Sequence, residues 1–227
     1  MSDIQDSLRR YDTFPKILLR NAEERPDDPA YRIKYHGIWQ TYSWRRTADM
    51  ARELALGLAD LGVKRGDKVA MIGYNRPEFY IAFDALEGLG AIPVPLYADS
   101  VADEMEYVLD HAEVSFAICE DQEQTDKILA VRERLPAVQT LIYVETKGMR
   151  NYHQPFLHEF AEVMAKGREF EAANPDFWLT EVAKANGDEL ALIAYTSGTT
   201  GRPKGVMLSA NALIDAGKMG IEFDGLK

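Results

Sequence analysis

The chain has 227 residues, of which 46% are hydrophobic, enough apolar content for one sizeable core or two small ones. Its formal net charge of −11 argues against a nucleic-acid-binding protein, because the basic surface that a phosphate backbone requires is missing. Every apolar run falls short of the ~20 residues needed to span a membrane, so we expect no transmembrane segment.

The expected cellular location follows from the N-terminus and the cysteine content. The first residues lack the basic and apolar regions of a secretory signal. The single cysteine, Cys119, cannot form an internal disulfide and lies in an apolar run, which favours a buried thiol in a reducing compartment. We therefore expect a cytoplasmic protein.

The N-terminal part is expected to contain a helix and a β-hairpin. Residues 1–12 are polar and are expected to be flexible. A helix is predicted over 14–25, with Thr13 as its candidate N-cap. Two stretches of alternating polarity, 30–35 and 38–42, are separated by a His-Gly pair, and this pattern predicts a hairpin with a tight turn. The histidine of that pair is interpreted as a turn residue.

After the hairpin, short apolar strands alternate with helices. The predicted helices cover 44–61, 77–89, 101–112 and 122–135, and the predicted strands cover 68–72, 91–96, 114–118 and 140–144. Ser43 and Asp121 are candidate N-caps, and Ser100 with Asp103 resembles a capping box. Strands separated by helices predict a parallel sheet with right-handed crossovers, and two prolines in the second strand argue for an edge or a short strand.

The alternation breaks down over 145–188, a polar segment in which helices are predicted at about 155–168 and 176–185. This segment is either an excursion between sheet elements or a lid-like insertion. The expected organisation is thus a hairpin and sheet over 13–144, a helical insertion over 145–188, and a loop with its flanking strands over 189–227, where another subdomain begins. The fold class is α/β, with an N-terminal β-hairpin and a mostly parallel sheet flanked by helices.

The histidines do not form a recognisable metal site. His111 lies on a predicted helix without a cysteine, histidine or carboxylate at metal-ligand spacing, and we interpret it as a packing or surface residue. His153 and His158, in the polar segment, lack such a partner as well.

A polar loop near the end of the sequence carries the strongest chemical signal. The apolar runs 190–195 and 206–208 predict two short buried strands, with a loop over 196–205 between them. The loop offers three glycines (Gly198, Gly201 and Gly205), four hydroxyls (Thr196, Ser197, Thr199 and Thr200) and the ammonium group of Lys204. Glycines permit positive φ and close approach of the backbone to a ligand, and amides, hydroxyls and an ammonium group are what a triphosphate needs.

The spacing of this loop excludes the two commonest phosphate-binding motifs. A Walker A motif requires Gly-Lys-Ser/Thr, whereas Lys204 follows Pro203 and precedes Gly205. The Gly-x-Gly-x-x-Gly pattern is also missing, because no glycine lies two residues before Gly198. By composition alone, a solvated turn would explain the loop equally well.

The order of residues from Tyr195 to Gly205, Tyr-Thr-Ser-Gly-Thr-Thr-Gly-Arg-Pro-Lys-Gly, resembles the phosphate loop of the AMP-forming adenylating enzymes. This family includes acyl-CoA synthetases, luciferases and peptide-synthetase adenylation domains. Segments 66–70 with 75–79, and 88–96, are similar to the first two core motifs of the family. The insertion before the loop is most like that of the long-chain fatty acyl-CoA synthetases. One departure is Ala210, where family members often carry a histidine.

The resemblance implies a ligase that activates a fatty acid with ATP and Mg²⁺ as acyl-AMP and transfers the acyl group to coenzyme A. It implies that the backbone of Ser197 to Gly201 holds the β- and γ-phosphates. Lys204 and Thr199 are the residues assigned to catalysis, and Thr196 is the candidate Mg²⁺ ligand. The implied nucleotide-binding set is Thr196, Ser197, Gly198, Thr199, Thr200, Gly201 and Lys204.

The resemblance also implies that the chain is a fragment, inactive by itself, because later family motifs and a C-terminal domain are missing from these residues. Three alternatives stay open: a ligase for an aryl or other acid, a peptide-synthetase-type domain, and a non-catalytic nucleotide-binding module. A kinase or GTPase is disfavoured by the spacing around Lys204. The expected partners are small molecules, peripheral contact with a membrane is compatible with the sequence, and the oligomeric state is not encoded in any motif.

Overall fold

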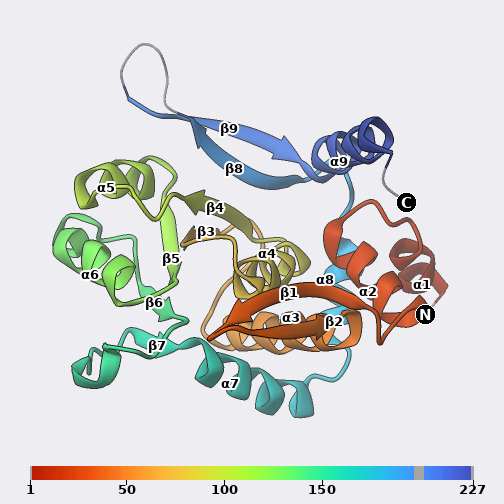
Figure 1. Ribbon diagram of the computed structural model, residues 1–227, viewed down its shortest axis with the longest axis horizontal. Coiled ribbons are helices and arrows are strands. Elements are labelled where there is room, and N and C mark those ends of the chain that lie inside the picture. The colour runs from red at the N-terminus through yellow and green to blue at the C-terminus, as the bar shows by residue number, and fades with distance from the viewer. Residues whose placement is uncertain (1, 197–201, 226–227) are drawn as a thin grey trace.

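The computed structural model describes residues 2–196 and 202–225 (Figure 1). A five-stranded parallel sheet forms the centre, with β-hairpins on two of its sides. The strands lie in the order β4 (Ile92–Leu96), β3 (Lys68–Ile72), β5 (Val114–Cys119), β6 (Thr140–Tyr143) and β7 (Leu157–Glu159), and every neighbouring pair is parallel. The predicted α/β class and parallel sheet are confirmed, and the proline-bearing β4 lies at an edge as expected.

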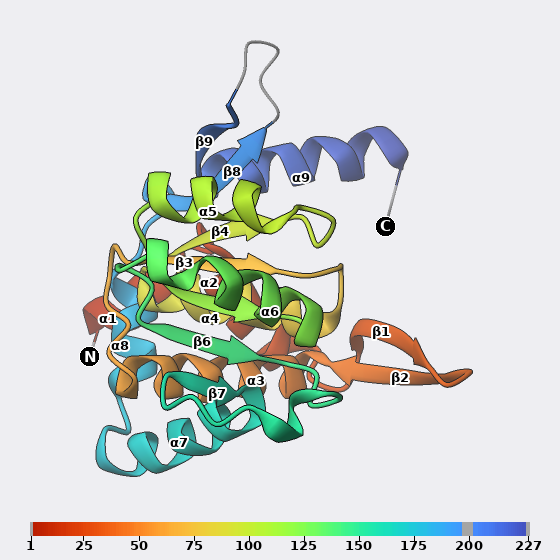
Figure 2. The ribbon, with the colours of Figure 1, turned by 90° about the vertical axis from the view of Figure 1, so that its left-hand side faces the viewer.

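Helices cover both faces of this sheet, whereas α9 lies beside the second hairpin. The described helices are α1 (Ser2–Leu8), α2 (Phe14–Glu24), α3 (Trp44–Asp60), α4 (Pro77–Leu89), α5 (Ala102–His111), α6 (Gln122–Val131), α7 (Phe160–Ala173), α8 (Phe177–Lys184) and α9 (Ala210–Asp224), with short 3₁₀ turns at Arg132–Arg134 and Met149–Asn151. Figure 2 shows α5 and α6 on the near side of the sheet and α4 behind it. In the described part of the chain, no helix combines the length and the apolar character needed to cross a membrane.

The side chains of β3, an interior strand of the sheet, alternate between two apolar cores. Val69 and Met71 of β3 pack with α3, α4, α7 and α8, whereas Ala70 and Ile72 pack with α5 and α6. Successive side chains of a strand point to opposite faces, so a strand that is apolar at every position must be covered on both. The short apolar runs of the sequence therefore required helices on both sides of the sheet.

Several helix starts follow from local chemistry. Ser43 Oγ accepts a hydrogen bond from Arg46 N (3.3 Å), and Asp121 Oδ1 accepts one from Gln124 N (3.1 Å), so both predicted caps are confirmed. The predicted capping box is wrong, because α5 begins at Ala102 with Val101 at its N-cap position and no side-chain cap.

The N-terminal part contains a helix that the sequence did not predict. Ser2–Leu8 form α1, and Ser7 Oγ donates a hydrogen bond to Ala183 O (2.5 Å), while the expected flexibility of residues 1–12 stays a prediction. Contact with α8, far along the chain, supports this helix. The helix after Thr13 is confirmed, but the Thr13 hydroxyl is buried without a hydrogen-bond partner among the described residues and does not cap it.

The first hairpin pairs β1 (Pro29–Tyr35) with β2 (Ile38–Ser43), as predicted. Its turn residues both have positive φ, 47° at His36 and 82° at Gly37, as a type I′ turn requires. The interpretation of His36 as a turn residue is confirmed.

The segment 145–188 packs on the body through its helices, with α7 against α3 and α8 against α4. It contains the unpredicted strand β7, which pairs with β6, and the helix expected over 155–168 begins only at Phe160. A three-residue strand that includes His158 and Glu159 shows too little periodicity to be recognised in a sequence. The predicted boundaries of this segment stay predictions.

Glycine allows the closest helix contact of this segment. A Cβ atom on Gly57 of α3 would lie 1.9 Å from Val163 O, and one on Gly167 of α7 would lie 1.8 Å from Glu53 O. Both distances are far inside van der Waals contact with a backbone that cannot move independently. The two helices therefore approach each other only because these positions carry no side chain.

Replacing Gly57 or Gly167 by alanine is expected to lower the free energy of unfolding by about 1–3 kcal/mol, because the added methyl group overlaps backbone atoms of the facing helix. Urea denaturation measures the effect. Gly217→Ala is the matched control, since nothing lies within 4 Å of a Cβ at this helical position. The control should be neutral or stabilising by roughly 0.5–1 kcal/mol, and equal losses in all three variants would contradict the explanation.

Two carboxyl groups are buried on α4. Burial raises the pKa of Asp84 to about 7. Burial, followed by the nearby Asp84, raises the pKa of Glu87 well above its usual range. Protonated carboxyls are therefore the form that the folded core prefers.

The raised pKa of Asp84 predicts that stability falls with rising pH. Between about pH 4 and pH 7 the unfolded chain releases a proton that folded Asp84 retains, so the free energy of unfolding decreases through this window. In Asp84→Asn the free energy of unfolding should fall less with rising pH, by an amount on the order of a few kcal/mol. Denaturation at pH 5 and pH 8 measures it, with the exposed Asp110→Asn as control; an unchanged slope in Asp84→Asn would rule out the assignment.

Candidate functional site

The polar loop joins the two strands of a second hairpin. β8 (Leu190–Thr196) runs toward the loop and β9 (Lys204–Ser209) runs back to α9 (Figure 1). The antiparallel register places Thr196 directly opposite Lys204 at the mouth of the loop. The structure thus brings together the first and the last of the predicted site residues. The other five, Ser197, Gly198, Thr199, Thr200 and Gly201, lie outside the described residues.

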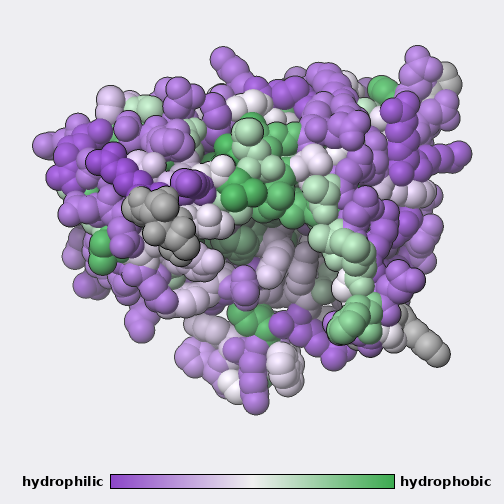
Figure 3. Space-filling model, turned by 90° about the horizontal axis from the view of Figure 1, so that it is seen from above, coloured by the Kyte–Doolittle hydropathy of each residue, from purple (hydrophilic) through white to green (hydrophobic). Residues whose placement is uncertain are grey.

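Only one of the two strands is buried. Ala191 and Ile193 of β8 are buried, and Ile193 belongs to the core that also contains β4 and α5. β9 was also expected to be buried, but Val206 is 41% and Met207 is 73% exposed. The prediction failed because β8 alone lies against the body. Figure 3 shows an apolar area in the middle of the face seen from above, the side on which β8, β9 and α9 lie.

Gly205 of β9 allows side chains of β8 to pack closely against its backbone. A Cβ atom there would lie 3.0 Å from Ile193 Cγ2 and 3.3 Å from Tyr195 Cζ. The φ angle of Gly205 is not positive, so the residue is needed for its missing side chain rather than for its backbone freedom. The ring of Tyr195 can therefore lie across β9 at the start of the loop.

Helix α5 holds both ends of the loop from one side. Tyr195 Oη lies 2.6 Å from His111 Nδ1, a hydrogen bond, and the two rings meet edge to face. Tyr107 Oη donates to Pro203 O (3.2 Å). Burial, followed by the nearby Tyr107, raises the pKa of Tyr195, so its hydroxyl stays protonated at neutral pH. His111, which we interpreted as a packing or surface residue, is exposed but contacts a residue of the motif itself.

The charges around the loop are mixed. The guanidinium group of Arg202 lies over the ring of Tyr107, 5.2 Å from its centre. Beside it is an open depression of about 620 Å³. Carboxylates of α5 line this depression together with Arg202 and Pro203: Asp103, Glu104, Glu106 and Asp110. An anionic ligand at the loop must therefore be bound by individual donors, since the wider surroundings are acidic.

No metal centre is formed by protein side chains alone in the described parts of the chain. Within residues 2–196 and 202–225, no three His, Cys, Asp or Glu side chains come together as metal ligands. The hydroxyl of Thr196, our candidate Mg²⁺ ligand, is exposed at the end of β8.

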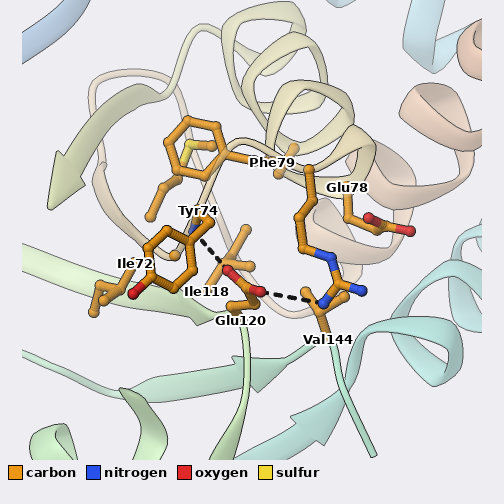
Figure 4. Close-up of a pocket in the computed structure, with 11 residues that line it drawn as sticks. Ile72, Tyr74, Glu78, Phe79, Ile118, Glu120 and Val144 are labelled. Carbon is orange, nitrogen blue, oxygen red and sulfur yellow. Dashed lines mark hydrogen bonds and ion pairs between the residues drawn. The ribbon is translucent and has the colours of Figure 1, made fainter. Parts of the chain in front are cut away.

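A second small site lies where the strand order reverses. β4 is on one side of β3 and β5 on the other, and ligands of open α/β sheets often bind beyond such a pair of strand ends. Here Glu120 occupies that position and accepts hydrogen bonds from Tyr74 N (2.5 Å) and Arg76 Nη1 (3.2 Å). Figure 4 shows the Glu120 carboxylate with these two interactions. The remaining cavity, about 20 Å³, has room for about one water molecule.

Comparison with known proteins indicates the same family as the loop motif. Residues 18–224 match the model of a family described as "AMP-binding enzyme". A long-chain-fatty-acid–CoA ligase of Rattus norvegicus, ACSBG2, is 32% identical over 217 residues, covering 93% of this chain and 31% of that protein. A long-chain-fatty-acid–CoA ligase of Mycobacterium bovis, FadD15, is 27% identical over 208 residues, covering 92% and 33%.

The solved structures confirm the fold. A long-chain-fatty-acid–CoA ligase from Archaeoglobus fulgidus, FadD1, superposes with a TM-score of 0.77 at 24% identity, covering 95% of this chain and 40% of that chain. The present chain thus spans about a third of the length of the curated relatives it matches.

The contact between α5 and the loop motif can be tested by removing one ring. His111→Ala is expected to loosen the end of β8 by about 0.5–1.5 kcal/mol, the usual net contribution of one hydrogen bond. Hydrogen exchange of the amides near Tyr195 and Gly205 should become faster, while exchange in the central sheet stays unchanged. His153→Ala, at an exposed position remote from the loop, is the control. Unchanged exchange at both amides would mean that α5 does not hold the loop.

Proposed function

Because the chain belongs to the AMP-binding enzyme family, we propose that it is part of an acyl-CoA ligase that activates a fatty acid with ATP. The observation that carries this proposal is the pairing of Thr196 with Lys204 at the mouth of a glycine- and hydroxyl-rich loop. The names of the curated relatives support a long-chain fatty acid as the substrate.

The proposed reaction has two steps. The carboxylate oxygen of the fatty acid attacks the α-phosphorus of ATP, and the bond to the β-phosphate oxygen breaks, which yields acyl-AMP and pyrophosphate. The thiol sulfur of coenzyme A, as it loses its proton, then attacks the acyl carbon and displaces AMP, which yields the thioester. Negative charge grows on the departing pyrophosphate in the first step, so donors aimed at it lower the barrier.

The proposed roles of the chain's own residues follow from this charge. Lys204 emerges from β9 beside the mouth of the loop, and its ammonium group would contact the β- and γ-phosphates as a point charge. In the proposal, the amides of residues 197–201 hold the same phosphates, and the Thr199 hydroxyl donates to the pyrophosphate as it leaves. Arg202 packs over Tyr107, and this contact orients Arg202 and Pro203, which lead from the loop to Lys204.

Mg²⁺ would fit this site only if the nucleotide phosphates supplied most of its ligands. Mg²⁺ takes oxygen ligands in octahedral geometry, keeps several waters, and is usually bound through one or two protein groups and the substrate phosphates. Thr196 supplies one exposed hydroxyl oxygen there, and the surrounding described residues add no cluster of ligands. When bound, the ion would neutralise part of the pyrophosphate charge.

We place the protein in the cytoplasm, with peripheral contact to a membrane from which a fatty acid would be drawn. Cys119 is buried, and burial raises the pKa of its thiol to about 12, so this cysteine is an unreactive core residue. Such a residue suits a reducing compartment.

The ligase proposal predicts the effect of one substitution. In the full-length protein that carries this chain, Lys204→Ala should slow fatty-acid-dependent pyrophosphate–ATP exchange by about 10- to 1000-fold, the range for loss of one charge-stabilising group. Lys218→Ala, on the exposed side of α9, is the matched control and should leave the rate unchanged. Exchange at the normal rate in Lys204→Ala would remove Lys204 from the proposed site. No exchange with any fatty acid, but exchange with an aromatic acid, would favour the aryl-acid alternative.

A further inference from the structure

The β1–β2 hairpin extends beyond the body of the molecule, as Figure 2 shows. Its base is anchored at two points. Tyr31 stacks on Tyr80 of α4 with 5.4 Å between ring centres, and Tyr42 Oη donates to Glu78 Oε1 (3.0 Å). Beyond these contacts, every residue from Lys34 to Thr41 is exposed. The hairpin is therefore fixed at one end and presents its other end to the surroundings.

Three large apolar side chains occupy the exposed end. Tyr35 is 50%, Ile38 is 66% and Trp39 is 62% exposed. The register pairs Tyr35 with Ile38 and Lys34 with Trp39, and adjacent pairs point to opposite faces of the hairpin. Each face of the tip therefore carries at least one large apolar side chain. A flat protein surface could cover only one of them, whereas a fluid phase that surrounds the tip would cover both.

The charge of the hairpin is opposite to that of the rest of the chain. Residues 29–46 contain four arginine or lysine residues and no aspartate or glutamate, in a chain with a net charge of −11. Arg45 pairs with Asp27 near the base, 3.6 Å apart, which leaves Arg32 and Lys34 as the exposed cations closest to the tip. Lys34 Nζ lies 5.9 Å from the centre of the Trp39 ring. The tip thus combines apolar side chains with cations that suit an anionic partner.

We propose that this tip, residues 34–39 with Arg32 beside it, inserts into the interface of a membrane that contains anionic lipids. Trp39 and Tyr35 have the amphipathic rings that favour the headgroup region, Ile38 reaches the acyl chains, and Arg32 and Lys34 contact lipid phosphates. The small contact area makes the binding weak and reversible. This membrane proposal rests on the proposed ligase function in one respect, namely that the expected substrate is a lipid.

Vesicle partitioning of the 227-residue chain tests the proposal without nucleotide, coenzyme A or fatty acid. Sedimentation with phosphatidylcholine vesicles containing 30% phosphatidylserine should show binding that weakens at higher salt and on omission of the anionic lipid. Trp39→Ser and Ile38→Ser should each reduce the partition coefficient by about tenfold. Lys34→Glu should reduce it as well. Circular dichroism and the melting temperature show that the variants stay folded.

Two matched controls lie on another surface. Phe223 of α9 is 92% exposed, so Phe223→Ser removes comparable apolar surface away from the hairpin, and Lys218→Glu makes the same charge change as Lys34→Glu. Both controls should bind vesicles like the unaltered chain. If they lose binding instead, the membrane contacts α9 and the proposal is overturned.

Tryptophan fluorescence reports the depth of insertion. Trp39 emission should shift to the blue on vesicle binding and be quenched by brominated lipids, whereas buried Trp178 should not respond. Trp39→Phe should keep most of the binding but lose this signal. Absence of vesicle binding by the folded chain, binding unchanged in the hairpin variants, or hairpin-dependent self-association in place of lipid binding would each overturn the proposal. None of these results would alter the exchange assay, so the membrane and ligase proposals fail separately.

Discussion

Val69 and Met71 of β3 pack into one apolar core while Ala70 and Ile72 pack into the other. This alternation excludes water from both faces of the sheet, so helices must follow the strands on either side. The parallel order then brings the carboxyl ends of β3, β5 and β6 to the same edge. Edge strand β4 pairs with β3 on one side, and β8 packs close to it.

The support of the loop depends on the same packing. α5 buries Met105, Val108 and Leu109 against the sheet, which holds the opposite side of the helix in place. Tyr107 and His111 on that side reach Pro203 and Tyr195. A helix held by a close-packed core moves little. α5 therefore fixes the positions of the two loop ends, although β9 itself is exposed.

The two proposed contact regions differ in their electrostatics. Beside the loop, Arg202 faces a carboxylate-rich helix, so an anionic nucleotide would depend on short-range donors. At the hairpin tip, Arg32 and Lys34 belong to a stretch, residues 29–46, that contains no acidic residue, so their attraction to an anionic surface acts over a Debye length. Figure 2 shows β1–β2 and β8–β9 extending from different sides of the body, which would allow both contacts at once.

Much of the fold and the identity of the candidate loop followed from local sequence patterns. The type I′ turn at His36-Gly37, the caps at Ser43 and Asp121, and four of the five parallel strands depend on residues within a few positions of one another. The eleven-residue motif likewise lies in one continuous stretch, so its chemistry could be recognised without a structure.

Tertiary structure alone decided the features that depend on distant residues. His111 and Tyr195 are 84 positions apart, β7 is too short to show a period, and α1 is held by a contact with α8. The burial of Asp84 and the helix contact at Gly57 arise only when α4 and α3 are packed against their neighbours. A sequence pattern reports which side of an element is apolar, but which groups meet there is determined by how the elements pack, and that information is not local.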